Sequence, residues 1–310
     1  MGGNSRAETT GLVVMGVFIV LAPALLYPVF LMKAMCFALF ACALNLLVGH
    51  LGLLSFGHAA YFGLGGYVAA WAAREWGVSA EGAILLGGLT GAGLGAVFGA
   101  LAIRRSGIYF SMITMALAQM VYFFCVQAPF TGGEDGIQNV PRAKLFGLFS
   151  LGGDGAMYGL VAVVFVAGFL LIRRIVASPF GQVIAAIREN EPRAISLGYR
   201  VGVYKWMAFV LSCFLAGVAG GTKALVFGIA TLADVHWSMS GEVILMTLVG
   251  GLGTLFGPAL GALILTAMET YLAPIGAWVT VTQGVIFVLC VLAFRRGIVG
   301  ELGAALRLRL

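Results

Sequence analysis

The densest group of charged side chains in this sequence lies between Ala177 and Lys205, with apolar segments of membrane-spanning length on both sides. So many charges cannot rest in hydrocarbon, so the segment must lie in water or against another protein. Its apolar residues Val183, Ile184 and Ile187 recur at helical spacing. The pattern indicates either a solvated loop or a docking element whose exposed apolar stripe a soluble partner grips. The polar residues concerned are Arg188, Glu189, Asn190, Glu191, Arg193, Arg200 and Lys205.

Helix boundaries can be read from the same segment. Ser178 is followed by a proline, which is typical of a helix start because proline costs nothing at the first helical position. A second short helix is expected to begin at Pro192, after Asn190 or Glu191, and to stop at Gly198, since glycine commonly ends helices. The segment is therefore predicted to be two short helices between two membrane spans.

No arrangement for catalysis or metal binding is found. There is no Gly-x-x-x-x-Gly-Lys-[Ser/Thr] loop, and no lysine follows a glycine, so the chain has no standard loop for binding ATP. His50 and His58 flank one glycine-rich turn, but two ligands without a nearby carboxylate do not make a zinc site. Helix-end or packing histidines are favoured over a proton relay. We expect no enzyme activity and no cofactor or metal bound by this chain.

The composition indicates an all-α polytopic membrane protein. Of 310 residues, 61% are hydrophobic and only 10% are charged, whereas charge makes up about a quarter of a soluble domain. The 46 glycines fit close helix packing in a bilayer. The net charge of +6 is read as membrane topology rather than nucleic-acid binding. All five cysteines lie in apolar runs and are expected to be buried thiols: Cys36, Cys42, Cys125, Cys213 and Cys290.

Charge and hydropathy together predict about ten passes in a single transmembrane domain, 1–310. An uncleaved first span is favoured over a signal peptide. Basic clusters mark the cytoplasmic side, and an even number of crossings between them requires 241–270 to be two passes or a re-entrant, glycine-broken pair. Both termini are then inside, 177–205 is a cytoplasmic loop, and 128–156 is the longest outer loop, either a flexible connection or a contact for a soluble partner. The other spans are 11–32, 34–48, 58–73, 82–103, 108–127, 157–172, 206–228 and 278–294. The basic clusters are Arg104 and Arg105, the region from Arg173 to Lys205, and Arg295, Arg296, Arg307 and Arg309.

Two glycine-rich stretches echo each other. Residues 47–59 read LVGHLGLLSFGHA and residues 248–259 read LVGGLGTLFGPA. Under the expected topology both turn at the cytoplasmic side, and paired glycine-interrupted segments are typical of transport pathways. Chance similarity in a chain rich in glycine and leucine is the alternative. The resulting candidates for the pathway or its gate are Gly49, His50, Gly52, Gly57, His58, Gly250, Gly251, Gly253, Gly257 and Pro258.

Ionisable groups also gather near the expected outer face. Lys223 and Glu269 adjoin long apolar sequence and are the more interesting candidates, because charges inside a membrane are functional by default. Asp234 and Glu242 are expected to sit in the interface. A zwitterionic solute needs one positive and one negative contact, and a mostly apolar path suits an aliphatic side chain.

Five blocks of sequence resemble the LivM-type permease of bacterial branched-chain amino acid ABC importers. They cover nearly the whole chain in the right order, and together they are highly specific. The blocks are NLLVGHLGLLSFGHAAYFGLGGYVAA (45–70), TGGEDGI (131–137), SPFGQVIAAIRENEPRAISLGY (178–199), YKWMAFVLSCFLAGVAGG (204–221) and LVGGLGTLFGPALGA (248–262).

The resemblance implies an inner-membrane subunit that pairs with a second, LivH-type permease. It also implies two cytoplasmic ATP-binding subunits, which hold ATP and Mg, and a periplasmic substrate-binding protein. The central segment looks like the coupling loop that docks on the ATPase, although Pro192 and Arg193 replace small or apolar residues of that pattern. The docking residues implied are Arg188, Glu189, Asn190, Glu191, Ala194 and Gly198.

Three functions follow from these observations. The leading one is a permease that moves branched-chain amino acids by alternating access driven by partner ATPases, with urea or short amides as alternative solutes of the same family. An ion-coupled secondary amino acid transporter is the rival, and it would need titratable residues buried mid-span. A structural membrane protein would leave the glycine-interrupted pair unexplained.

Overall fold

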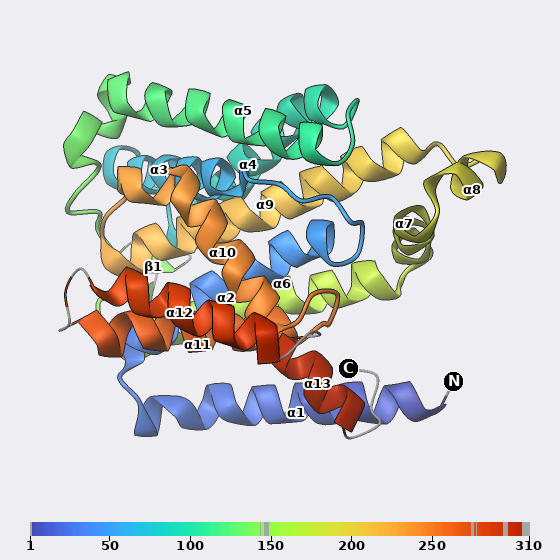
Figure 1. The fold of residues 1–310 in the computed structure, drawn as a ribbon. Coiled ribbons are helices and arrows are strands. Elements are labelled where there is room, and N and C mark those ends of the chain that lie inside the picture. The colour runs from blue at the N-terminus through green and yellow to red at the C-terminus, as the bar shows by residue number, and fades with distance from the viewer. Residues whose placement is uncertain are drawn as a thin grey trace.

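The computed structural model describes residues 2–142, 144–145, 149–273, 276, 278–293 and 297–305. In this part of the chain helices make up nearly the whole structure, and the exception is a two-residue antiparallel hairpin, β1 (Lys144–Leu145) with β2 (Phe149–Ser150). Figure 1 shows most helices running along one common direction, with α7 and α8 projecting at one end. The prediction of an all-α polytopic membrane protein is confirmed.

Helices occupy the places of the ten predicted passes. Five are long and apolar enough to cross a membrane by themselves: α2 (Pro28–Val48), α4 (Ala80–Ala102), α5 (Ile108–Gln127), α6 (Asp154–Ala177) and α9 (Val201–Phe227). The others are α1 (Gly2–Leu25), α3 (His58–Glu75), α10 (Trp237–Gly250), α11 (Gly257–Leu272) and α12 (Trp278–Ala293). The short helices are α7 (Pro179–Glu189), α8 (Glu191–Ser196) and α13 (Gly297–Ala305). The predicted glycine-broken pair is therefore α10 and α11, two short helices joined by a turn.

The boundary between the first two spans lies earlier in the chain than the sequence predicted. A single span over 11–32 is wrong, because α1 ends at Leu25 and α2 begins at Pro28. Proline is tolerated in the first turn of a helix but breaks a helix interior, so Pro28 fixes this boundary. Lys33 consequently lies inside α2 rather than between two spans.

A tightly packed core unit is formed by α3, α4 and α9. Glycines stand where these helices cross: a methyl group added at Gly65 would lie 2.7 Å from the Cα of Gly217, and one added at Gly217 would overlap the carbonyl oxygen of Gly87. Small residues let membrane helices approach closely enough for backbone contact. We infer that these three helices form one rigid body.

In its described residues, the segment predicted as the long outer loop, 128–156, holds little regular secondary structure. It holds two 3-10 helices, η1 (Pro129–Thr131) and η2 (Gly133–Asp135), and the hairpin β1–β2. Ile137 forms an isolated bridge with Ala230 at the far end of α9, and Arg142 pairs with Asp154 at 2.7 Å. The end of the predicted loop is helical, because α6 already begins at Asp154.

Several sequence predictions lie partly outside the described residues. Cys36, Cys42, Cys125 and Cys213 are buried free thiols, as expected, whereas the side chain of Cys290 is outside the description. The same is true of the last basic cluster, which comprises Arg295, Arg296, Arg307 and Arg309. Figure 1 shows that α1 begins, and α13 lies, toward the end of the bundle that carries α7 and α8.

Candidate functional site

The helix α7 begins where the sequence predicted. Ser178 caps it, because its Oγ accepts a hydrogen bond from the Gly181 amide at 3.3 Å, and Pro179 occupies the first turn. Such a cap is worth about 1 kcal/mol. The helix therefore starts directly after α6, and the chain turns sharply as it leaves the bundle.

The helix α8 is also set by local signals. The Asn190 side chain accepts a hydrogen bond from the Arg193 amide at 3.0 Å, so Asn190 ends α7 and caps α8 at once. Gly198 follows the helix with a φ of +88°, the left-handed conformation that favours glycine. The two predicted short helices are confirmed, with α8 beginning one residue before Pro192.

The expected exposed apolar stripe is instead buried in the protein itself. Ile184 is 0% exposed and Ile187 is 3% exposed, so both belong to the core, as does Ala194 on α8. Among the exposed apolar side chains at this end are Ile195, 58% exposed, and Leu197, 69% exposed. A partner that docks here would meet such side chains rather than the two buried isoleucines of α7.

An ion pair with one buried member joins α8 to α9. Lys205 is only 6% exposed, and its Nζ lies 2.6 Å from a carboxylate oxygen of Glu191, whose side chain is 41% exposed. The buried ammonium group would be costly without this partner, so the two helices are expected to move together. Glu189 is exposed.

Arg188 is exposed, but its guanidinium turns back toward the bundle. Its guanidinium donates a hydrogen bond to the carbonyl oxygen of Gly49, just after the last residue of α2. The aliphatic part of the Arg188 side chain packs against Gly52, where an added methyl group would lie 3.2 Å from Arg188 Cγ. The guanidinium packs against Gly253, where an added methyl group would lie 3.3 Å from Arg188 Nη1. One side chain of α7 thus contacts both glycine-rich turns.

The two turns also contact each other, through Asn45. Its amide nitrogen donates to the Thr254 carbonyl at 2.9 Å, and its amide oxygen accepts from the Gly253 amide at 3.0 Å. Sequence analysis missed Asn45, although a buried polar residue inside an otherwise apolar span was a signal for it. The structure therefore brings the two echoing stretches side by side at one end of the bundle.

The glycines of the turns are required by their backbone. Gly52, Gly251 and Gly253 have φ values of +80°, +124° and +75°, a region that other residues rarely adopt. Gly250 and Gly257 approach each other so closely that neither has room for a methyl group. Thr254 Oγ1 holds the second turn, since it accepts from the Gly257 amide at 3.2 Å and donates to the Gly251 carbonyl at 2.8 Å.

The remaining turn candidates lie at helix ends. Gly57 precedes α3 and donates its amide to Ser55 Oγ at 3.3 Å, and an added methyl group there would overlap the carbonyl oxygen of Thr114. Pro258 occupies the first turn of α11, where its missing amide donor costs nothing. Both residues therefore help to set where the second helix of each pair begins.

The two histidines have different surroundings. His58 is fully buried, and its two ring nitrogens each lie 2.9 Å from a serine oxygen, in Ser55 and Ser212. His50 Nδ1 lies 3.3 Å from the Asn45 carbonyl oxygen, and burial together with the nearby Arg188 charge lowers the pKa of His50. A neutral His50 avoids repulsion with that guanidinium. Both contact sets are those of packing and helix-end histidines.

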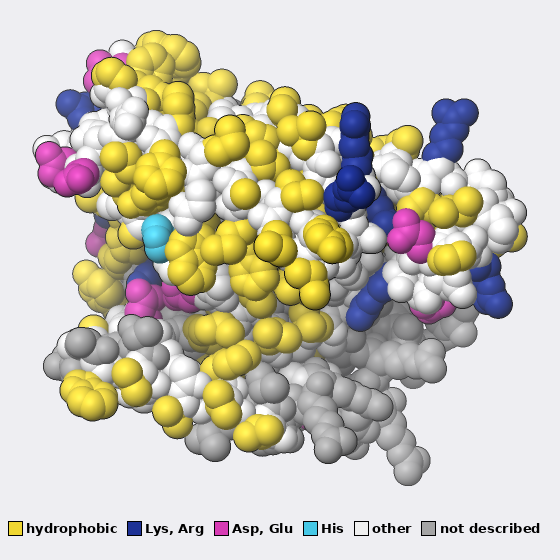
Figure 2. All heavy atoms as spheres, turned by 45° about the horizontal axis from the view of Figure 1, so that its top comes forward, with side chains coloured by type: hydrophobic (Ala, Val, Ile, Leu, Met, Phe, Trp, Pro, Cys, Tyr) yellow, Lys and Arg dark blue, Asp and Glu magenta, His cyan; other side chains and the backbone are white. Residues whose placement is uncertain are grey.

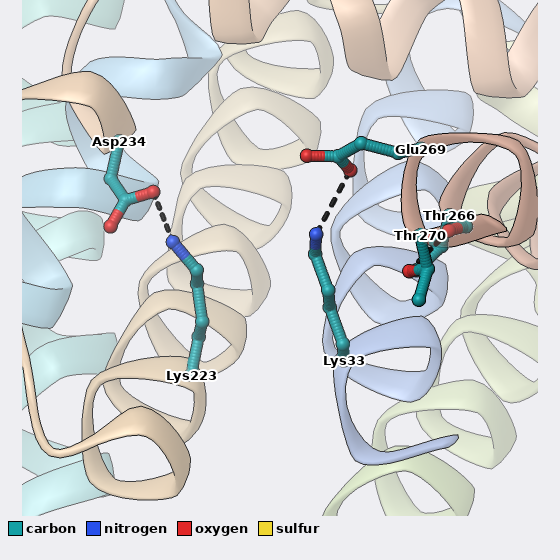
Figure 3. A network of polar contacts seen from close by, with 6 residues as sticks. All are labelled: Lys33, Lys223, Asp234, Thr266, Glu269 and Thr270. Carbon is teal, nitrogen blue, oxygen red and sulfur yellow. Dashed lines mark hydrogen bonds and ion pairs between the residues drawn. The ribbon is translucent and has the colours of Figure 1, made fainter. Parts of the chain in front are cut away.

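Charged residues meet at the opposite end of the bundle (Figure 3). Lys223 and Glu269, singled out by sequence, do not pair with each other: Lys223 pairs with Asp234, and Glu269 pairs with Lys33 at 3.0 Å. Asp234 lies in the 3-10 helix η3 (Leu232–Asp234) and is only 6% exposed. Its position in the membrane interface stays a prediction. Glu242 lies on α10 and is half-buried.

A bundle of apolar helices with charged groups at its ends and paired glycine turns is that of a polytopic membrane protein. The chain belongs to the family described as branched-chain amino acid transport system / permease component, whose model matches residues 28–294. It is therefore an ABC-transporter permease of this family, and the LivM-type resemblance noted from the sequence is confirmed.

Curated relatives agree with this assignment. The high-affinity branched-chain amino acid transport system permease protein LivM of Escherichia coli K12 is 25% identical, over 89% of this chain and 70% of the relative. The LivM protein of Salmonella typhimurium has the same identity and coverage. The autoinducer 2 import system permease protein LsrC of Klebsiella pneumoniae is 28% identical over 54% of this chain and 49% of the relative. No solved structure matches the chain significantly.

Proposed function

We propose that this chain is a membrane-spanning subunit of an ATP-driven importer of branched-chain amino acids in a bacterial inner membrane. Two cytoplasmic ATP-binding subunits, with their ATP and Mg, would dock at α7 and α8. A second, LivH-type permease would complete the pore, and a periplasmic substrate-binding protein would deliver the solute. The support for these partners is the family membership and the names of the LivM relatives.

The observation that carries the proposal is the inward position of Arg188. A displacement of α7 by a docked partner must move the guanidinium, which is hydrogen-bonded to the Gly49 carbonyl and adjoins Gly253. These turns join α2 to α3 and α10 to α11. Closure of the ATP-binding subunits would thus change the angle between the helices of each pair, which is one way to achieve alternating access.

The orientation follows from the same arrangement. If α7 and α8 meet cytoplasmic ATPases, the two turns are cytoplasmic and both described chain ends are on the inside, as the charge distribution predicted. The charged cluster around Lys223 then faces the periplasm, where a binding protein would dock. The solute assignment is supported by the two LivM relatives, while LsrC shows that a partial relative serves a different solute.

The test is transport by the complex that co-purifies with the tagged full-length chain from its native membranes, reconstituted in proteoliposomes. We expect co-purified ATP-binding subunits and ATP-dependent uptake of labelled leucine. Uptake that persists without ATP would overturn the ABC mechanism in favour of an ion-coupled carrier. Uptake of urea, short amides or autoinducer 2, with none of leucine, would overturn the solute assignment alone.

Substitution tests the role of Arg188 in the same vesicles. Arg188→Met removes the hydrogen bond that links α7 to the first glycine turn, so leucine uptake per ATP hydrolysed should fall several-fold. Arg105→Met is the matched control, because Arg105 is an exposed arginine in the turn between α4 and α5, where the same charge is lost. Equal uptake by both variants would refute the proposed transmission through Arg188.

A further inference from the structure

Two ion pairs face each other at the end of the bundle opposite the glycine turns (Figure 3). Lys33 on α2 pairs with Glu269 on α11, and Lys223 on α9 pairs with Asp234 on η3. The two ammonium groups each lie 5.9 Å from the centre of the Phe37 ring, so twice that distance is the most that can separate them. Four separate elements therefore converge on one small charged region.

The region holds one more carboxylate than ammonium groups. Glu242 on α10 is close enough to feel the charges of Lys33, Lys223, Asp234 and Glu269. Within the described residues Glu242 forms no ion pair or hydrogen bond. Burial and the nearby Glu269 disfavour the charged form of Glu242, so a bound cation would stabilise that form.

The two pairs also differ in how deeply they lie. The side chains of Lys33 and Glu269 are 23% and 39% exposed, whereas those of Lys223 and Asp234 are 17% and 9% exposed. Thr231 Oγ1 fixes the inner pair, since it donates to Asp234 at 3.2 Å.

We propose that Lys33, Lys223, Asp234, Glu242 and Glu269 form a binding site for the charged head of a free amino acid on its way into the pore. The proposal rests on the proposed function and names the part of the solute that the permease itself recognises. The α-ammonium group would bind the unpaired carboxylate of Glu242. The α-carboxylate would replace Glu269 or Asp234 as the partner of a lysine, so the ion pairs rise from two to three while one protein carboxylate stays unpaired, as in the empty site.

This exchange explains why paired charges suit the site. A lysine already paired in the empty protein carries no uncompensated charge at membrane depth, where isolated charges are costly. A zwitterion brings one charge of each sign and leaves the total unchanged. A neutral amide or urea offers no carboxylate to replace a protein carboxylate, so the site selects against neutral solutes.

The test uses the reconstituted complex with leucine as the probe and the number of leucine molecules moved per ATP hydrolysed as the readout. We expect Lys223→Met and Lys33→Met each to lower this number roughly tenfold, as the loss of a charge-assisted contact implies. Lys223→Arg should retain most of it. Arg142→Met is the matched control, because it breaks the half-exposed Arg142–Asp154 pair in the segment that follows α5.

A structural role for the inner pair is separated by a double variant. Lys223→Met with Asp234→Leu removes both charges, so no unpaired charge is left buried. If the pair only holds η3 against α9, the double variant should recover the leucine yield of the wild type, and the proposal is overturned. Recognition predicts that the yield stays low. If wild-type vesicles move no leucine at all, the proposed function fails instead.

Discussion

The contact between the two glycine turns can be tested by removing one amide. Asn45 is 3% exposed and satisfies two backbone groups of the second turn, the Gly253 amide at 3.0 Å and the Thr254 carbonyl at 2.9 Å. Asn45→Ala leaves both groups without these partners. Gly253 is exposed and Thr254 is half-buried, so water can replace part of each lost hydrogen bond. With a net contribution of about 0.5–1.5 kcal/mol per hydrogen bond, the variant should lose about 1–3 kcal/mol of stability.

The measurement is thermal unfolding of the purified protein in detergent, followed by a fluorophore that reacts with thiols. Cys36, Cys42, Cys125 and Cys213 are buried, so they should react only as the fold opens. Asn45→Ala should unfold at a clearly lower temperature than the wild type.

The matched control is Gln127→Ala, because Gln127 is an exposed amide at the end of α5. A second variant, Asn45→Asp, keeps the acceptor for the Gly253 amide but turns an acceptor toward the Thr254 carbonyl. It should therefore also be destabilised. If Asn45→Ala and Gln127→Ala unfold at the same temperature, Asn45 does not join the turns as argued here.

Two further predictions concern packing and orientation. Gly261→Ala would place a methyl group onto the Met246 carbonyl oxygen between α10 and α11 and should destabilise the fold by about 1–3 kcal/mol. In Gly93→Ala the methyl group meets open space, so the fold should not be destabilised. The thiol assay compares the two variants, and equal unfolding temperatures would contradict the prediction. A cysteine at Glu189 should react with a membrane-impermeant maleimide only from the cytoplasmic side, and one at Asp135 only from the periplasmic side. The reverse pattern in intact cells and inverted vesicles would overturn the orientation and the docking of ATPases at α7.

The sequence predicted best what depends on neighbours along the chain. Ser178, Asn190 and Gly198 set the ends of α7 and α8 through contacts within three residues, so their types and spacing were enough. The echo between the two turns was visible because each turn needs glycines for its own backbone. The break before Pro28 was available from the same kind of signal but was overlooked.

Contacts between distant elements could not be predicted in this way. Sequence spacing gives no means of deciding that Lys223 pairs with Asp234 rather than with Glu269, because the choice depends on how α9, η3 and α11 pack. The inward direction of Arg188 has the same origin. From sequence alone, a charge in a polar segment is expected to be solvated, because its neighbour in space, here the end of α2, is not known.

Helix α9 forms an ion pair near each of its ends. Lys205 holds Glu191 near its first turns, and Lys223 holds Asp234 near its last. Its 27 residues span about 40 Å at the helical rise, and its glycine-lined contacts with α3 and α4 leave little freedom to bend. Such a stiff helix couples its two ends. A displacement of α8 would move the opposite end of α9 directly, without transmission through loops. A single helix would therefore coordinate ATP hydrolysis with entry of the solute.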